Sequence, residues 1–123
     1  MKLQELLEKY EFHDSGLEGV LYHSETQHAE VEIEFCNWKQ DYFKKGMPEQ
    51  PIIRLVFTGV SEMEHAGLDQ YDEGNTILDA SLVQNHSVQE GIEFLVYNVQ
   101  TNEAKHLRIF AEDVEFVMVD STS

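Results

Sequence analysis

Apolar residues near the start of the chain recur with the period of a helix. Four of them fall at positions i, i+3, i+4 and i+7, namely Leu3, Leu6, Leu7 and Tyr10. Charged residues lie between them, so the apolar side chains form one stripe along a helix. The pattern predicts a short helix within residues 1–11, followed by a connection through residues 12–16.

From residue 17 onward the pattern changes to the alternation that is typical of a strand. In the clearest case apolar residues alternate with glutamates: Ala29, Val31, Ile33 and Phe35 against Glu30, Glu32 and Glu34. A strand with one apolar and one acidic face belongs to an antiparallel sheet with one side in water. Polar residues 25–27 predict a turn, so we expect a hairpin of residues 17–24 and 28–36.

Alternation continues in five more segments. Strands are predicted at residues 52–60, 76–83, 92–99, 105–111 and 114–119. Residues 76–83 also fit a short helix, and a strand is the favoured interpretation there. Glycine and proline make residues 44–51 a loop, and residues 61–75 are acidic and irregular. About seven antiparallel strands at this spacing are typical of a sandwich or an open barrel.

The predicted fold class is therefore mainly β (α+β), with one short N-terminal helix. We expect a single domain over residues 1–123, because this length is sufficient for one hydrophobic core. Its expected parts are the helix at 1–11, the antiparallel strands within 17–119 and a frayed tail at 120–123.

Charge narrows the classes of partner. The chain has 24 acidic and 8 basic residues and a net charge of −16 at pH 7, and residues 55–104 contain no lysine or arginine. Such a surface repels nucleic acid and anionic membranes and attracts basic proteins. We therefore expect no nucleic-acid partner and no membrane partner, and we expect a basic protein to be the preferred target.

The predicted compartment is the cytoplasm. The first residues lack the basic end and apolar run of a signal peptide, and no run of ten apolar residues occurs that could begin a transmembrane helix. The single cysteine, Cys36, cannot form an internal disulfide. A lone thiol is typical of a reducing compartment.

Candidate catalytic chemistry is sparse. His13, Asp14 and Ser15 are the three residue types of a hydrolase triad, but neighbours on an extended chain point in different directions. A turn-forming role for Asp14 or Ser15 fits the pattern better. The chain lacks a Gly-x-Ser-x-Gly elbow and a phosphate-binding glycine loop. We expect no catalytic residues and no cofactor, and hence no enzyme.

Metal-ligand spacing is also missing. None of the six histidines has the His-x-x-x-His spacing of a helical zinc site, although His23 and His28 flank the predicted hairpin turn and could approach each other there. The segment 69–74 has a glycine at the sixth position counted from its first acid, as a calcium loop does. Ala80 stands where that loop needs its bidentate glutamate. We predict no metal site.

An aromatic group follows the clearest strand. Trp38, Tyr42 and Phe43 could form a platform for a small ligand, or they could cover one end of a sandwich core. In the first case His13 and Asp14, near the start of the first strand, are further candidate ligand-binding residues.

A resemblance adds a concrete role. The segment Phe12–His13–Asp14–Ser15, followed by Leu17, Val20 and Tyr22 and by the strand Val31–Phe35, resembles a group of small bacterial domains. Those domains are of unknown function or are predicted immunity proteins of polymorphic toxin systems, of the immunity-50 type. The resemblance implies a β meander that binds a toxin, and it implies no catalytic residues.

Two function hypotheses follow. The favoured one is a non-catalytic acidic protein-binding domain, an immunity protein in its concrete form, that docks a basic toxin. Its candidate partner-binding residues are Glu62, Glu64, Asp69, Asp72 and Glu73. The alternative is a small-ligand or metal-binding β-barrel, and its candidate ligand-binding residues are Trp38, Tyr42, Phe43, His13 and Asp14.

Overall fold

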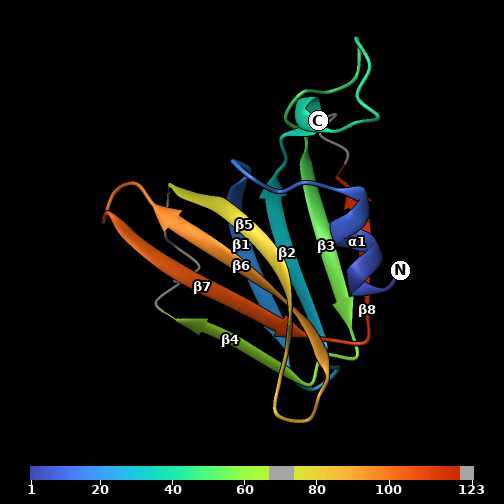
Figure 1. Cartoon of the computed structure of the whole chain (residues 1–123), viewed down its shortest axis with the longest axis vertical. Helices are drawn as coiled ribbons and strands as arrows, with labels where there is room; N and C mark the ends of the chain where they lie inside the picture. The colour runs from blue at the N-terminus through green and yellow to red at the C-terminus, as the bar shows by residue number, and fades with distance from the viewer. Residues whose placement is uncertain (67–73, 120–123) are drawn as a thin grey trace.

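The structure is a computed structural model that describes residues 1–66 and 74–119, and in that part of the chain it has one α-helix, one 3₁₀-helix and eight strands (Figure 1). The elements are α1 (Leu3–Lys9), β1 (Gly16–His23), β2 (His28–Glu34), η1 (Asn37–Lys39), β3 (Ile52–Thr58), β4 (Glu62–Ala66), β5 (Asn75–Gln84), β6 (Glu90–Asn98), β7 (Glu103–Phe110) and β8 (Asp113–Met118). The predicted mainly β fold with one short N-terminal helix is confirmed. The predicted first hairpin is confirmed as well, since β1 pairs with β2 across the turn.

One strand lies where the sequence pattern predicts irregular structure. β4 falls inside residues 61–75 and pairs with β7 over its whole length, which raises the number of described strands from the expected seven to eight. Met63 and His65 share one face of β4 and pair with Ile109 and Leu107, but His65 is exposed. With a single apolar residue facing inward, β4 shows almost no alternation of its own. The rest of that segment, 67–73, and the predicted tail, 120–123, lie outside the described residues.

All eight strands belong to one antiparallel sheet in the order β4-β7-β6-β5-β1-β2-β3-β8. The pairing between β5 and β1 is confined to Gly16 and Thr76, so the sheet consists of two four-stranded halves. Two backbone hydrogen bonds extend this narrow joint, because Asp14 N donates to Ile77 O and Ile77 N donates to Ser15 O, each at 2.8 Å. The joint is the narrowest pairing in the sheet. Figure 1 shows β6 and β7 crossing in front of β1.

Both halves enclose the same core. Their inward residues are fully buried and belong to one hydrophobic cluster that includes Val31, Ile33, Ile53, Leu55, Phe57, Ile92, Phe94, Val96, Leu107 and Ile109. Phe12 connects the halves directly, since its ring lies 5.5 Å from that of Phe35 and 5.9 Å from that of Phe94. The arrangement agrees with the expected sandwich or open barrel.

Helix α1 covers this core and packs against β5, β6 and β8. Leu3 and Leu6 are buried, as the helical stripe predicts. The residue before the helix protects a sheet edge: Met1 and Val114 on the edge strand β8 exchange two backbone hydrogen bonds, at 2.9 and 3.0 Å. Such pairing blunts an edge that could otherwise bind another strand. No helix in residues 1–66 or 74–119 has the length and apolar character needed to cross a membrane.

Candidate functional site

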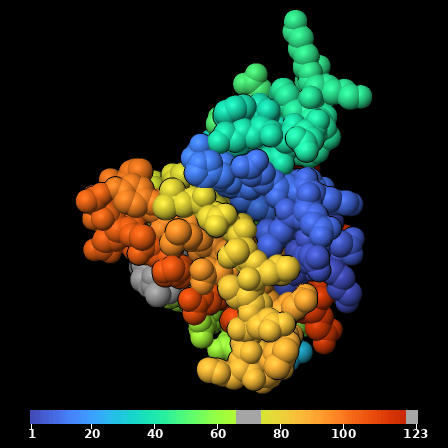
Figure 2. All heavy atoms as spheres, in the orientation of Figure 1, coloured from blue at the N-terminus to red at the C-terminus, as the bar shows by residue number. Residues whose placement is uncertain are grey.

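A cleft of about 360 Å³ lies where the end of α1, the connection from α1 to β1, the segment after η1 and β5 meet. Its lining includes Leu7, Glu11, His13, Gln40, Asp41 and Asp79. Figure 2 shows these parts of the chain meeting on the face toward the viewer, with the N-terminal segment in blue, the segment around residue 40 in teal and β5 in yellow. Segments that are far apart in the sequence therefore build this cleft together.

Gln40 fixes the connection between α1 and β1 beside the cleft. Its Oε1 accepts a hydrogen bond from the backbone N–H of Glu11 at 2.9 Å, and its Nε2 donates to the backbone C=O of Glu11 at 2.8 Å. The same Nε2 also donates to the C=O of Cys36 at 3.0 Å. Gln40 is buried, so these hydrogen bonds are shielded from water and define the position of Glu11.

His13, Asp14 and Lys39 form a continuous chain of polar contacts at one end of the cleft. His13 Nδ1 donates to the C=O of Leu78 on β5 at 2.6 Å, and its Nε2 lies 3.3 Å from Oδ1 of Asp14. Lys39 Nζ donates to Oδ2 of Asp14 at 2.7 Å. This hydrogen bond holds the pKa of Asp14 below its usual value and raises the pKa of Lys39. The contacts tie β5 to η1.

Ser15 takes no part in this chain of contacts. It is fully buried, and its Oγ accepts a hydrogen bond from the N–H of Cys36 at 3.0 Å. Asp14 adopts a left-handed conformation with a φ of 68°, which turns the chain between His13 and Ser15. The three residues therefore diverge, as expected for neighbours, and His13 and Asp14 alone approach each other.

The predicted ligand-binding aromatics are not gathered around the cleft. Trp38 is 49% exposed, and the ammonium of Lys39 lies 5.4 Å from its ring centroid. Tyr42 donates a hydrogen bond to Asn37 Oδ1, and its ring meets that of Tyr10 edge-on at 6.2 Å. Burial raises the pKa of Tyr42, with a further contribution from Tyr10.

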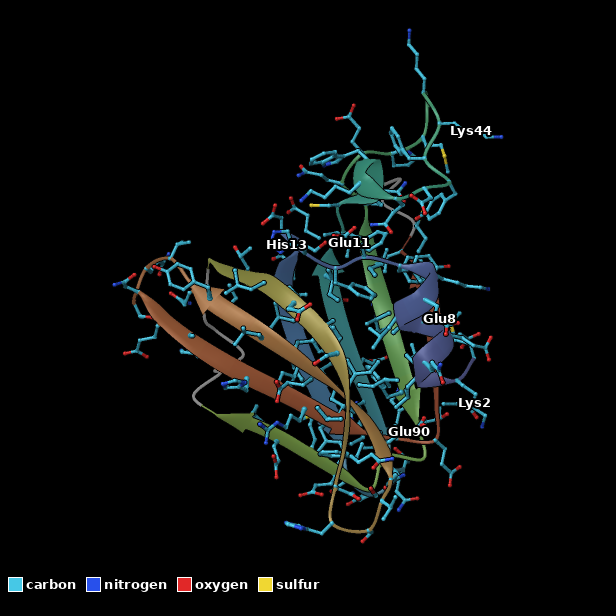
Figure 3. The ribbon with its side chains drawn as sticks, viewed as in Figure 1. Lys2, Glu8, Glu11, His13, Lys44 and Glu90 are labelled. Carbon is cyan, nitrogen blue, oxygen red and sulfur yellow. The ribbon has the colours of Figure 1, made fainter. Side chains whose placement is uncertain are left out.

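Of the predicted ligand set, His13 lines the cleft, whereas Trp38, Tyr42, Phe43 and Asp14 do not. Figure 3 shows His13 and Glu11 on the strand-like connection that follows α1, and Lys44 near the end of the loop that projects beyond the sheet. The ligand hypothesis therefore moves from the aromatic residues to the cleft beside them. Gln40, Asp41 and Asp79 had no sequence signal of their own, because their role depends on strand order.

The predicted partner-binding residues on β4 share the outer face of the sheet. Glu62 and Glu64 alternate with the inward Met63, as the strand geometry requires. Glu64 is partly neutralised, because its Oε2 lies 3.4 Å from Nη1 of Arg108 on β7, and Arg108 Nε also donates to Glu93 on β6 at 2.5 Å. The other predicted partner residues, Asp69, Asp72 and Glu73, lie outside the described residues.

A second acidic surface lies on the other half of the sheet. It is the outer face of β1 and β2 and contains Glu18, Glu30, Glu32 and Glu34. Partial burial raises the pKa of Glu18, and the negative charges of Glu34 and Glu32 raise it further. Arg54 on β3 donates to Glu32 at 2.8 Å. Sequence alternation predicted the outward glutamates of β2, but the approach of Glu18 depends on a register shift between Leu17 and Gly19.

Among residues 1–66 and 74–119, no three His, Cys, Asp or Glu side chains are arranged to hold a metal ion. The rings of His23 and His28 do approach each other across the first hairpin, with centroids 5.9 Å apart. Cys36 is a buried free thiol, and its Sγ donates to the C=O of Asp14 at 3.5 Å. Cys36 lies beyond the end of β2 at Glu34, just before η1.

These observations define the chain as a mainly β, strongly acidic domain with an open polar cleft beside the joint of its two half-sheets. Comparison with protein-family models and with curated proteins finds no match to this chain. The resemblance to immunity-type domains thus rests on the segments from Phe12 to Phe35 alone.

Proposed function

We propose that this chain is a non-catalytic, acidic protein-binding domain whose partner is a basic protein, and that in its concrete form it is an immunity protein that neutralises a basic toxin. The observation that carries the proposal is the excess of carboxylates on the outer face of β1–β3. Four glutamates stand there beside a single arginine, Arg54. Complementary charge of this kind speeds association and selects basic partners.

The face on β1 and β2 is the preferred contact surface. Partial burial raises the pKa of Glu18, and the negative charges of Glu34 and Glu32 raise it further, so the carboxylate of Glu18 lies in a repulsive field. A lysine or arginine from a partner would relieve this repulsion and gain charge-assisted hydrogen bonds. On β4 and β7, by contrast, Arg108 already contacts two carboxylates and leaves less unbalanced charge.

The test is a comparison of three glutamate-to-glutamine variants with equal loss of charge. One carries Glu18→Gln, Glu32→Gln and Glu34→Gln; a second carries Glu62→Gln, Glu64→Gln and Glu73→Gln; the control carries Glu5→Gln, Glu25→Gln and Glu103→Gln. Basic proteins captured from a lysate at low salt are identified, purified and titrated against each variant. The first variant should lose most affinity and the control least, and added salt should weaken the wild type.

Equal losses of affinity in all three variants would show that the interaction depends only on the net charge of the chain. That result would contradict a defined contact surface. A loss confined to the second variant would move the contact to β4 and the acidic segment after it. Failure of the wild type to bind any basic protein with salt-sensitive affinity would overturn the proposed function. If a toxin gene lies next to the gene of this chain, survival of cells that express both proteins would support the immunity role directly.

A second candidate function is the binding of a small ligand, and the cleft beside His13 favours it. Its volume of about 360 Å³ is within the range of small-molecule sites. Thermal shift against a panel of small molecules, together with metal analysis of the purified protein, tests this candidate. A stabilising compound whose effect is lost in the His13→Ala variant would support it.

A further inference from the structure

The lining of the cleft has a small apolar part and a larger polar part, whose carboxylates form an acidic rim. Leu7, Phe12 and Ala80 contribute the apolar part, and Phe12 and Leu7 belong to the core cluster or pack against it. The rim carries four carboxylates, which come from three separate segments: Glu8, Glu11, Asp41 and Asp79. A ligand that fits both parts needs a short aliphatic body and at least one positive charge.

The basic residues of the cleft do not cancel this charge. Lys39 is already matched, because its ammonium lies 2.7 Å from the carboxylate of Asp14, which is outside the lining. Lys9 is the other lining lysine, and it is exposed in the last turn of α1. Asp14 is the main partner of Lys39, and Glu11 contributes more weakly to the raised pKa of Lys39. The four lining carboxylates therefore still outnumber the remaining ammonium, that of Lys9. The cleft is therefore selective for cations over anions.

We propose that the cleft is a binding site for an alkylammonium group, offered either by a free diamine or polyamine or by a lysine side chain of a protein. This inference rests on the second candidate function, small-ligand binding, and names its ligand class. The ammonium group contacts one or two of the lining carboxylates of Glu11, Asp41 and Asp79. The methylene groups contact Leu7 and Ala80, where they leave water.

The position of the rim supports a preformed site. Gln40 holds the backbone of Glu11 through two hydrogen bonds, and Asp79 lies in β5 one residue beyond Leu78, whose carbonyl accepts from His13. Two of the carboxylates thus stand on backbone that is already ordered, which lowers the entropy cost of binding. A bare divalent ion fits less well, since no three acidic, histidine or cysteine groups in residues 1–66 and 74–119 converge on one point.

The experiment is a titration followed by two-dimensional amide NMR and by calorimetry. The probes are 1,4-diaminobutane, spermidine and Nα-acetyl-lysine amide, with 1,4-butanediol as the uncharged control of equal length and Mg²⁺ as a cation without an alkyl chain. We expect saturable shifts at the amides of His13, Gln40 and Asp79 with the amines. The tighter of spermidine and the lysine derivative identifies the natural source of the group.

Two double variants locate the binding. Asp41→Asn combined with Asp79→Asn should weaken diamine binding by about tenfold or more, since two contacts of the ammonium lose their charge. Both residues are exposed, so the double variant should fold normally. The matched control, Glu25→Gln combined with Glu103→Gln, removes the same total charge far from the cleft and should change binding less than about twofold.

Equal shifts with Mg²⁺, or equal losses in the control variant, would reduce the effect to counterion screening and overturn the proposal. Binding of butanediol or another neutral compound, with no binding of amines, would overturn the amine assignment and leave small-ligand binding in place. If no probe and no member of the small-molecule panel perturbs the cleft amides, both the inference and the second candidate function fail.

Discussion

Gln40 binds the backbone of Glu11 through both ends of its side-chain amide. The two hydrogen bonds, 2.9 and 2.8 Å long, imitate the exchange of N–H and C=O bonds between neighbouring strands. They connect the 36–51 loop to the segment between α1 and β1. Gln40 therefore holds in place both one wall of the cleft and the end of the helix. This contact spans 29 positions of sequence and has no counterpart in any local pattern.

Replacing Gln40 with alanine should destabilise the fold by about 1–3 kcal/mol, because the backbone N–H and C=O of Glu11 lose their partners in a partly buried setting. Chemical denaturation of the variant measures the change in the free energy of unfolding. Gln50→Ala is the matched control, since Gln50 is exposed in the same loop. Equal stability of the two variants would show that the amide bridge contributes nothing.

Gly91 on β6 lies directly beneath the ring of Phe110 on β7. A Cβ atom at Gly91 would stand 2.5 Å from Cδ1 of Phe110 and 2.8 Å from the backbone oxygen of Ile109. Gly91→Ala should therefore cost about 1–3 kcal/mol of stability through overpacking. Gly19→Ala on β1 is the control, because a Cβ there meets no atom within 4 Å and should be neutral or slightly stabilising.

Glu18 should make stability depend on pH. Burial and the charges of Glu34 and Glu32 raise its pKa in the folded state above the value of 4.5 for an unperturbed glutamate. Protonated Glu18 therefore favours the folded state, and this contribution to stability is fully present below pH 4.5. It is lost as the pH rises through the folded-state pKa of Glu18 and the carboxyl group becomes charged. Glu18→Gln should thus raise the melting temperature at neutral pH, and the advantage should shrink in acid.

The melting curve of Glu25→Gln provides the comparison for this pH effect. Glu25 is exposed in the β1–β2 turn, so its replacement removes the same charge without relieving the crowded glutamates. A gain at neutral pH that is the same in both variants would assign the effect to the net charge of −16 and contradict the local repulsion.

Leu6 tests the contribution of α1 to the core. Its side chain is fully buried in the cluster that the two half-sheets share. Leu6→Ala should lower the free energy of unfolding by about 2–5 kcal/mol, through lost burial and a cavity. Gln4→Ala removes an exposed hydrogen bond to Glu8 at 3.1 Å. This change should lower the free energy of unfolding by about 0.5 kcal/mol at most. Similar losses in the two variants would mean that the helix is not part of the core.

Local patterns predicted the elements that carry strong alternation. Ala29, Val31 and Ile33 point inward along β2, and the helical stripe places Leu3 and Leu6 in the core. β4 escaped prediction because Met63 is its one inward apolar residue. The pattern also left open whether β2 is an edge strand, whereas the structure places it between β1 and β3.

The candidate sites show the same division. Glu62 and Glu64 were found from charge alone, and the structure adds Arg108, which contacts Glu64 from another strand. The cleft was not predictable, because Glu11, Gln40 and Asp79 belong to segments that meet only after the half-sheets close. His13 was selected from a short motif, and its bond to the carbonyl of Leu78 became visible only in the folded chain.

The sequence by itself determined the class of fold, the inward face of each clearly alternating strand and the strongly acidic surface. These properties follow from the backbone period and from composition, which act over a few residues at a time. Tertiary structure alone decided the strand order, the joint at Gly16 and Thr76, and the convergence of Glu11, Gln40 and Asp79. Those features depend on which distant segments bury their apolar faces together, and no local period encodes that choice.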